Sequence, residues 1–410
     1  MMILHVPAFR RLLVGATLSQ LGDVFFLVAI PWVVLDLSGS ALAMSSILIT
    51  VAIPRAGLML FGGALSDRVS VRSILIVSNL TLMACVGVVA FLAQQHLLAL
   101  WMLYIIALIF GTADAFAAPA MKVLVPSIVA QEEIPAANSL LQTAMQLCLL
   151  GGAGAAGLTI QRFGIASAMA IDAVSFLVLI AALVSIREAR RVPFQARSVL
   201  AAIGDGIQFV LRDPSLRLLI IVIAVVNFAI TGATQIGIVM LVHTRFGSAA
   251  DYGSLVAATA IGSVLGYLVA GSIKVGDTLV SAIFGAALLL GIALGTLSVA
   301  MPIWALFGVL LFCGIVAGFV NVQAISFLQS TVIPEMLGRV MSLVALASIG
   351  IAPLSLAIGG FIAQQNLSAL FITSGTVLVS IALVGWPISK RALHFSSRNR
   401  LDVSGVDSNI

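Results

Sequence analysis

Charged residues are scarce in this sequence. Asp, Glu, Lys and Arg make up 9% of its 410 residues, whereas a soluble domain carries about 25%. Hydrophobic residues make up 61% and the mean hydropathy is +1.22, against about 45–50% apolar residues in soluble domains. A soluble protein of this composition would lack a polar coat. The sequence therefore predicts an integral membrane protein.

Cysteine, histidine and nucleotide-binding motifs are also sparse. The three cysteines, Cys85, Cys148 and Cys313, lie singly inside apolar runs and predict packing residues. The four histidines form no metal-ligand pattern, so we expect neither a metal nor another cofactor. No G-x-x-x-x-G-K-[ST] loop is present. We therefore expect no ATP hydrolysis and no catalytic residues, and the proton gradient is the natural energy source.

Twelve apolar runs are long enough to cross a bilayer as helices, which takes about 20 residues each. This predicts an all-α membrane protein of twelve spans, at residues 12–36, 41–65, 73–93, 97–119, 136–158, 166–186, 216–241, 249–273, 278–301, 303–327, 340–363 and 368–388.

The basic residues set the orientation. The net charge of +5 is not taken as a sign of nucleic-acid binding. If both termini are cytoplasmic, every Lys and Arg except Arg55, Arg162 and Arg245 lies on the inner side, as the positive-inside rule requires. We expect a multi-pass protein of the cell (inner) membrane.

The spacing of the spans predicts two halves. Residues 1–186 and 216–388 each hold six spans, and the linker 187–215 carries apolar residues at helical spacing, which predicts a helix on the inner membrane surface. Residues 389–410 are expected to be a disordered cytoplasmic tail. The stretches VPSIVAQEEIPAANSL and IPEMLGRVMSL precede the fifth and eleventh spans. Their likeness favours a duplicated six-helix unit.

A charged stretch between the second and third spans carries a specific resemblance. GALSDRVSVR, residues 63–72, resembles the signature loop of the major facilitator superfamily, with Ser70 and Val71 in place of the usual Gly and Arg. ANSLLQ, IDAVSFL, GIQFVLRDPSLR, GRVMSL and SQLGDVFFLVAIPW look like the drug–proton antiporter branch that includes macrolide-efflux proteins and the enterobactin exporter. Ala153 replaces the Pro of the antiporter motif in the fifth span.

The resemblance implies a conformational latch. Asp67 would face the positive N-terminal end of the eleventh helix, near Arg339. Arg68 or Arg72 would pair with a carboxylate at an inner helix end, for which we expect Asp114 of the fourth span. The latch residues are therefore Gly63, Asp67, Arg68, Arg72 and Arg339. The alternative is a solvated turn that serves only the positive-inside rule.

Ionisable residues within the spans each need a reason, because a lone charge at the bilayer centre costs roughly 2.5–3.5 kcal/mol. Asp23 and Arg55 lie near the middle of the first and second spans and are expected to pair. In one interpretation, Asp23 is the proton-coupling carboxylate and Arg55 tunes its pKa. In the other, the pair only fixes how the two helices pack. Asp114 is a further proton-coupling candidate. Asp172 is expected to make a packing hydrogen bond.

Polar residues within the spans suggest a substrate cavity. Each is alternatively a helix–helix contact. The candidates are Gln20, Phe25, Gln142, Gln146, Asn227, Gln235, Asn321 and Gln323. GAGAAG, residues 152–157, lies inside an apolar helix and predicts close packing through small residues.

These observations predict a secondary transporter that exports amphiphilic small molecules in exchange for protons, by rocking of its two halves. Its partners are the small-molecule substrate, protons and the lipid bilayer, and we expect a monomer. Uptake or uniport of a metabolite by the same fold is one alternative. A second is an integral-membrane enzyme, which would need a polar catalytic cluster at one membrane face.

Overall fold

The computed structural model describes residues 2–66, 69–186, 207–211, 213–272, 279–332, 336, 340–341, 343–344 and 346–406. This part of the chain is helical and contains no strand. The long apolar runs explain this, because a helix satisfies every backbone group within its own segment while crossing lipid.

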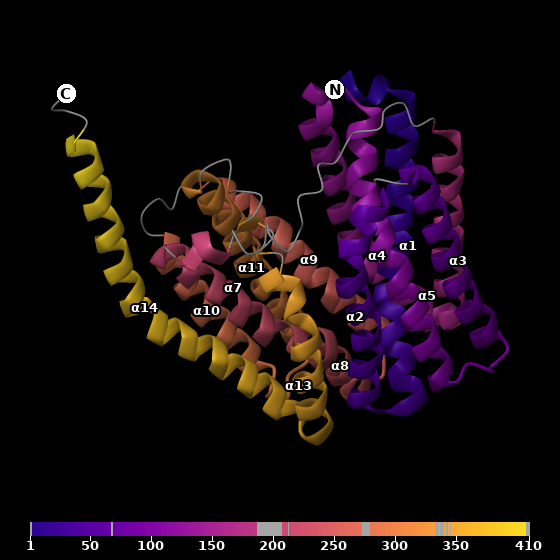
Figure 1. Ribbon diagram of the computed structural model, residues 1–410. Coiled ribbons are helices and arrows are strands. Elements are labelled where there is room, and N and C mark those ends of the chain that lie inside the picture. The colour runs from indigo at the N-terminus through magenta and orange to yellow at the C-terminus, as the bar shows by residue number, and fades with distance from the viewer. Residues whose placement is uncertain are drawn as a thin grey trace. The chain divides into compact units, whose positions relative to one another are not determined.

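The first half of the sequence forms η1 (Met2–His5), α1 (Pro7–Ser38), α2 (Ala41–Ser66), α3 (Val71–Gln94), α4 (Leu100–Ile128), η2 (Gln131–Glu133) and α5 (Ile134–Ser185) (Figure 1). The second half forms α7 (Pro214–Gly232), the π-helix η3 (Ala233–Ile238), α8 (Val239–Arg245), α9 (Ala249–Ser272), α10 (Leu279–Thr296), α11 (Ile303–Thr331), the π-helix η5 (Leu346–Gly350), α13 (Ala352–Gln365) and α14 (Leu367–Val406).

The described helices are consistent with twelve spans. Ten are long and apolar enough to cross a membrane. One of them contains α5, which Gly164 divides in two because its backbone (φ 79°, ψ 171°) is not helical. A shorter apolar helix, Ala282–Thr296, lies within α10. α10 has 18 residues, a length of about 27 Å at 1.5 Å per residue, close to the ~30 Å hydrocarbon core.

Local signals in the sequence end and begin the helices of the first half. α1 ends at Gly39, whose φ of 60° is left-handed and whose N–H bonds to the carbonyl of Leu35. Glycine adopts this conformation without strain. α3 begins at Ser70, whose hydroxyl accepts a hydrogen bond from the backbone N–H of Ser73. Ser70, one of the departures from the family loop, is thus an N-cap.

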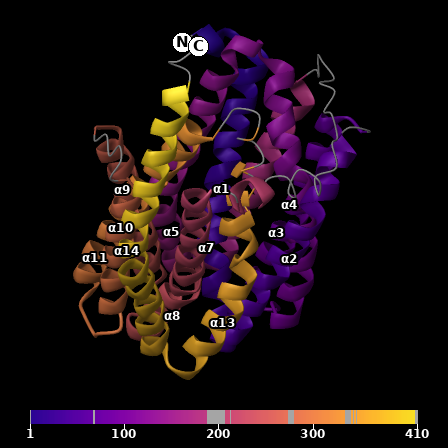
Figure 2. The same cartoon turned by 60° about the vertical axis from the view of Figure 1, so that its left-hand side comes forward.

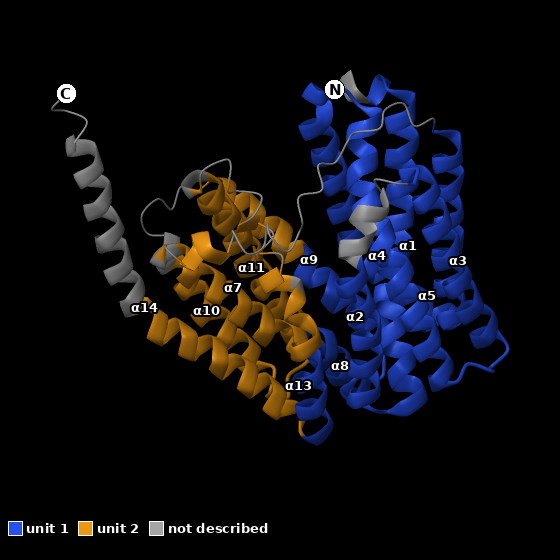
Figure 3. Cartoon of the chain, viewed as in Figure 1, with its two compact units in different colours: residues 1–196, 234–260, 356–365 blue, residues 197–233, 261–355, 366–410 orange. Residues whose placement is uncertain are grey.

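The chain divides by its contacts into two compact units (Figure 3). Unit 1 comprises Met1–Ala196, Thr234–Ala260 and Leu356–Gln365, and unit 2 comprises Arg197–Ala233, Ile261–Ser355 and Asn366–Ile410. Unit 1 therefore contains the first half together with α8 and parts of α9 and α13. The predicted halves, residues 1–186 and 216–388, do not coincide with these units. That each half moves as one body stays a prediction.

In unit 1, α1 packs mainly on α5, α2 on α4, and α3 on both α4 and α5. A cluster of fully buried side chains joins α1, α3, α4 and α5 near the start of α1, including Phe9, Leu12, Leu75, Leu124 and Leu183. Lipid is as apolar as these side chains, so the stabilisation comes from close packing rather than from release of water.

In unit 2, α14 lies beside α10 and α7 (Figure 1 and Figure 2). Phe284 of α10 is fully buried, and Gly385 of α14 leaves room for its ring. The hydroxyl of Ser355 in α13 accepts a hydrogen bond from the N–H of Gly232 at 2.9 Å and donates to the carbonyl of Phe228 at 2.5 Å. These two hydrogen bonds support the end of α7, where the helix passes into the wider turns of η3.

Two expectations concern the linker and the tail. The predicted surface helix in the linker lies mostly outside the described residues, although residues 207–211 are helical. α14 runs to Val406, past the predicted end of the last span at Ile388. The disordered cytoplasmic tail expected at residues 389–410 stays a prediction.

Candidate functional site

An ion pair lies inside the spans of unit 1. Arg55 of α2 and Asp114 of α4 are joined by a distance of 2.9 Å from Nε to Oδ2. Asp114 lies in the middle of α4, because this helix continues through Pro119 and Pro126 to Ile128. The prediction that Asp114 lies near the inner end of its helix is therefore wrong. The guanidinium of Arg55, at similar depth in α2, balances the charge of Asp114.

Asp23 lies near the middle of α1 and is half-buried. It is close enough to Asp114 and Arg55 to feel the charges of both. It forms no hydrogen bond or ion pair with any residue that the structure describes. The expected pairing of Asp23 with Arg55 is corrected: α2 packs far more extensively on α4 than on α1, which brings Arg55 to Asp114 instead.

The three residues form a centre with two carboxylates and one guanidinium, which we call the charge triad (Asp23, Arg55, Asp114). The side chain of Arg55 is 49% exposed and that of Asp114 is 24% exposed. Charged groups at this depth in a membrane face a water-filled cavity or the bundle interior, not lipid. Arg55, with about half of its side chain exposed, is the most accessible member of the charge triad.

Asp172 lies next to the charge triad but is fully buried. Its Oδ1 lies 3.4 Å from the hydroxyl of Ser175, which also donates to the carbonyl of Asp172 at 2.7 Å. Gly22 of α1 packs against both side chains so closely that a Cβ there would collide with them. Within the described part of the chain, Asp172 Oδ2 has no hydrogen-bond partner. The expected packing hydrogen bond is thus present through Ser175.

The loop that resembles the facilitator signature is described in part. Gly63 lies in the last turn of α2, while Asp67, Arg68 and Arg339 lie outside the described residues. Arg72 donates from Nη2 to the carbonyl of Val184, and Arg11 donates from Nη1 to that of Ser185. Both arginines therefore bind the C-terminal carbonyls of α5, where a helix favours positive charge.

Of the two arginines expected to pair with Asp114, Arg72 does not, whereas Arg68 lies outside the described residues. Asp114 lies too deep in α4 for a residue at the start of α3, and the end of α5 supplies nearer acceptors. Arg72 fastens α3 to α5 within the first half. The pairing proposed for Asp67 with the start of the eleventh helix stays a prediction.

The cavity candidates differ in exposure. Phe25 and Gln323 are buried, and the Gln323 amide donates to the carbonyl of Ala270 in α9 at 3.2 Å, which favours packing roles for both. Asn227 donates to its own helix at the carbonyl of Ile223. Gln20 and Gln146 are half-buried. Three candidates are exposed and remain the best placed to meet a ligand: Gln142, Gln235 and Asn321.

Comparison with known proteins agrees with this architecture. The family of transmembrane secretion effectors matches residues 2–404. The chain belongs to the major facilitator superfamily. It is similar to the multidrug efflux pump Tap of Mycolicibacterium fortuitum, with 26% identity over 91% of this chain and 93% of that protein, and to macrolide efflux protein A of Streptococcus pyogenes, with 23% identity over 92% and 94%.

A solved structure shows the same fold. The nucleoside transporter NupG superposes with a TM-score of 0.75 over 92% of this chain and 98% of its own, at 13% sequence identity. The facilitator fold and the relatives establish a membrane transporter of small molecules. The alternative of an integral-membrane enzyme is thereby set aside.

The sequence analysis missed a group of side chains where α1 ends. Nε2 of His243 in α8 lies 2.8 Å from Oδ1 of Asp36. The ring of Trp32 meets the His243 ring edge to face at 5.1 Å, and Tyr252 of α9 stacks on Trp32 at 6.4 Å. Asp36 and His243 both lie at the ends of predicted spans, on the same side of the membrane. This placement could have been found from the facilitator's sequence.

Further contacts join the two sequence halves of the facilitator at this end of unit 1. The Ser40 hydroxyl donates to Oε1 of Gln364 at 3.0 Å, and the N–H of Ala249 donates to Oε1 of Gln161 at 2.9 Å. Gly157 of the GAGAAG stretch packs against the backbone of α9 at Gly253, as its small residues predicted. We call this set of contacts the Asp36 end.

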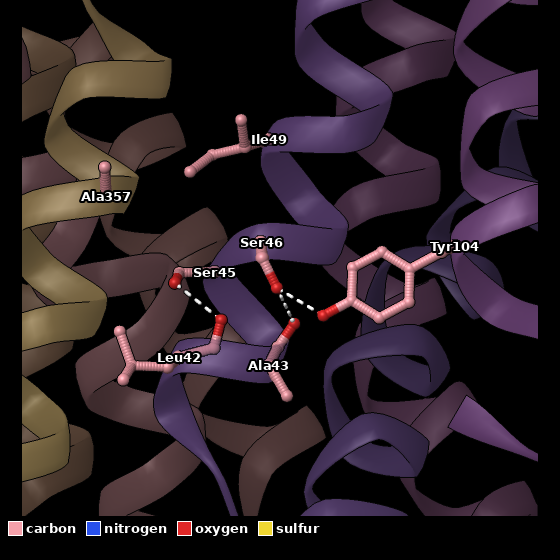
Figure 4. Close-up of a pocket in the computed structure, with 7 residues that line it drawn as sticks. All are labelled: Leu42, Ala43, Ser45, Ser46, Ile49, Tyr104 and Ala357. Atoms are coloured by element: carbon pink, nitrogen blue, oxygen red, sulfur yellow. Dashed lines mark hydrogen bonds between the residues drawn. The ribbon is translucent and has the colours of Figure 1, made fainter. Parts of the chain in front are cut away.

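A shallow cavity of about 490 Å³ opens beside the Asp36 end (Figure 4). Its hydroxyl groups are already engaged: Ser46 and Tyr104 share a hydrogen bond of 2.5 Å, and Ser45 donates to the carbonyl of Leu42 at 3.0 Å. No polar group shown in the cavity points to a missing partner. Its lining residues are Leu42, Ala43, Ser45, Ser46, Ile49, Tyr104 and Ala357.

Proposed function

We propose that this facilitator exports amphiphilic small molecules in exchange for protons. The observation that carries the proposal is the charge triad. It holds two carboxylates and one guanidinium at mid-membrane depth, with Arg55 and Asp114 partly exposed. Intramembrane acids are rare, costly and concentrated at proton and ion pathways. The similarity to a multidrug efflux pump and to a macrolide efflux protein supports export rather than uptake.

The proposal assigns a role to each member of the triad. Asp23 has no hydrogen bond or ion pair among the described residues, because Arg55 pairs with Asp114, so we assign it the uptake and release of the proton. When Asp23 is charged, it competes with Asp114 for Arg55, because one guanidinium offers its full set of donors to one neighbour at a time. When Asp23 is protonated, Arg55 stays with Asp114, as in this structure.

This exchange links the proton to conformation. A shift of Arg55 between α4 and α1 changes which helices of the first half are held together. A ligand can bias such an equilibrium only through its different affinity for the two states. A cationic or polar substrate group that binds near Asp23 would compete with the proton for the same carboxylate. Because substrate and proton cannot occupy the same carboxylate together, the export of one substrate molecule is exchanged for the import of a proton.

The orientation with both termini in the cytoplasm belongs to the same proposal and follows from the distribution of basic residues. We place the protein in the cell (inner) membrane as a monomer. Under this orientation the Asp36 end faces the outside, because α1 begins in the cytoplasm and crosses once.

Efflux from a pump-deficient bacterium tests the proposal. Cells that express the chain are loaded with amphiphilic dyes and antibiotics, with and without an uncoupler. We expect lower accumulation, abolished by the uncoupler and by Asp23→Asn. Glu132→Gln is the matched control, because Glu132 is an exposed acid in η2 outside the spans. Export that survives Asp23→Asn removes the proton role from Asp23. Accumulation above that of empty cells indicates uptake.

A further inference from the structure

We propose that an apolar layer closes the charge triad towards the Asp36 end of unit 1 and keeps protons from leaking between the triad and that end. The layer consists of two contacts between neighbouring helices, and all of its residues lie in unit 1. Its role against a leak rests on the proposed function of Asp23, whereas its packing does not. We call it the apolar seal (Phe26, Val51, Phe110 and Gly111).

The first contact of the seal is a stack of two phenylalanine rings between α1 and α4. The ring centroids of Phe26 and Phe110 are 4.4 Å apart, and the ring planes are inclined by 4°. Phe26 follows Asp23 by three residues, and Phe110 precedes Asp114 by four. At a rise of 1.5 Å per residue, each ring therefore starts about 5 Å from its acid along the helix. The stack bridges the two helices that carry the carboxylates of the triad.

The directions of the helices place both rings on the same side of the triad. Phe26 lies beyond Asp23 along α1, towards the end of that helix. α4 starts at this end of unit 1, because Tyr104 in its first turns bonds to Ser46 near the start of α2, the helix that follows α1. Phe110 therefore also lies between its acid and the Asp36 end.

The second contact of the seal closes α2 onto α4. A Cβ at Gly111 would collide with the backbone of Val51, so the two helices meet without a side chain between them. Val51 precedes Arg55 by four residues and Gly111 precedes Asp114 by three, which places this contact one turn from the ion pair, on the side of the stack. Beyond Arg55, a Cβ at Gly57 would meet nothing within 4 Å. Close packing of α2 therefore covers the ion pair towards the Asp36 end.

The stack continues into a buried apolar cluster on α3 and α5. Phe26 and Phe110 pack against this cluster, which includes Leu82 and Val86 of α3 and Phe176 of α5, each at most 4% exposed. Dense packing leaves the two rings little room to turn aside. Apolar constrictions hold back water and ions, because a wetted path through them is unfavourable. A chain of water from the Asp36 end would therefore be interrupted one turn before it reaches the charge triad.

Such a seal is needed because Asp23 is proposed to carry protons only in exchange for substrate. In alternating access, substrate and proton reach the same site from one side of the membrane at a time. A second route through the helices of unit 1 would let protons pass without substrate and would dissipate the gradient. Exclusion of water from a reactive centre prevents this kind of proton leak.

Thiol labelling tests the seal without transport or protons. Cys85, Cys148 and Cys313 are replaced by Ala, and Asp23→Cys supplies a single thiol. A charged, membrane-impermeant methanethiosulfonate reagent is applied to intact cells and, separately, to inverted vesicles. Phe110→Ala should raise the labelling rate from the Asp36 side by about two- to ten-fold, the factor that loss of one aromatic stack gives, and leave the rate from the other side unchanged.

Two control variants separate the seal from general damage. Phe110→Leu keeps an apolar side chain in the layer and should raise the labelling rate less than Phe110→Ala. Phe91→Ala removes a ring that is 63% exposed on α3 and should leave the rate unchanged. An unchanged rate in Phe110→Ala overturns the proposal. A rise from one side matched by a fall from the other also overturns it, because that result reports a shift between conformations.

Proton leak in liposomes then tests the role of the seal. An imposed pH gradient without substrate should decay faster through Phe26→Ala than through the parent or Phe91→Ala, and adding Asp23→Asn to Phe26→Ala should slow it again. Faster labelling without any leak overturns the proposal. A leak that persists after Asp23→Asn supports the seal and counts against the proton role of Asp23, which belongs to the proposed function.

Discussion

Arg55 forms its ion pair with Asp114 of α4, at 2.9 Å, and not with Asp23 of α1. One guanidinium therefore stands among two carboxylates in the first half of the chain. Only one of them is neutralised in this conformation. Under the proposed function, Asp23 is the carboxylate that carries the proton, because Arg55 pairs with Asp114 and not with Asp23.

We expect the Arg55–Asp114 pair to contribute modestly to stability. Because Arg55 is 49% exposed, solvent screens the pair, and a double-mutant cycle of Arg55→Gln and Asp114→Asn should give a coupling free energy of about 1 kcal/mol or less. Thermal unfolding in detergent measures it. The same cycle with Arg55→Gln and Glu132→Gln should give no coupling. A coupling of several kcal/mol would identify a rigid structural bridge that does not exchange partners.

The contact between α1 and α5 at Gly22 should tolerate no side chain. A Cβ at Gly22 would collide with Ser175 and Asp172, whereas one at Gly154 of α5 meets nothing within 4 Å. Gly22→Ala should therefore destabilise the protein by about 1–3 kcal/mol, and Gly154→Ala should change the free energy of unfolding little. Melting temperatures of the two purified variants decide this. Equal stability would mean that α1 and α5 are further apart than the structure shows.

The buried Asp172 should be dispensable for proton exchange. It is fully buried and packed against Gly22, and its Oδ1 already accepts a hydrogen bond from the hydroxyl of Ser175. Asp172→Asn preserves the shape of the side chain and should keep efflux within about two-fold of the parent, while Asp23→Asn abolishes it. Efflux lost equally in the two variants, at equal amounts of folded protein, would place Asp172 on the proton route.

The spans could be predicted from the sequence because the bilayer imposes one simple constraint, a long apolar helix. The run around Asp23 and the run around Arg55 each gave a helix with the charged residue near its middle. The fold then followed from the number of spans and from the loop at residues 63–72. The superfamily matched along residues 2–404 confirms it.

The pairing of side chains could not be predicted in the same way, because it depends on how each helix is rotated and which neighbour it packs against. Arg55 met Asp114 because α2 packs on α4. Arg72 bonds to the end of α5, where the carbonyl of Val184 accepts its hydrogen bond. The Asp36–His243 pair joins residues 207 positions apart, and no periodicity within either helix relates them.

The most direct test of the central claim is proton movement by purified protein in liposomes. A gradient of a dye that the efflux panel identifies as substrate is imposed, and an internal pH indicator records protons moving in exchange. We predict proton movement against the dye in the parent, none in Asp23→Asn, and dye–dye exchange retained in both. Proton movement in Asp23→Asn equal to that of the parent would contradict the account and place the exchangeable proton outside Asp23.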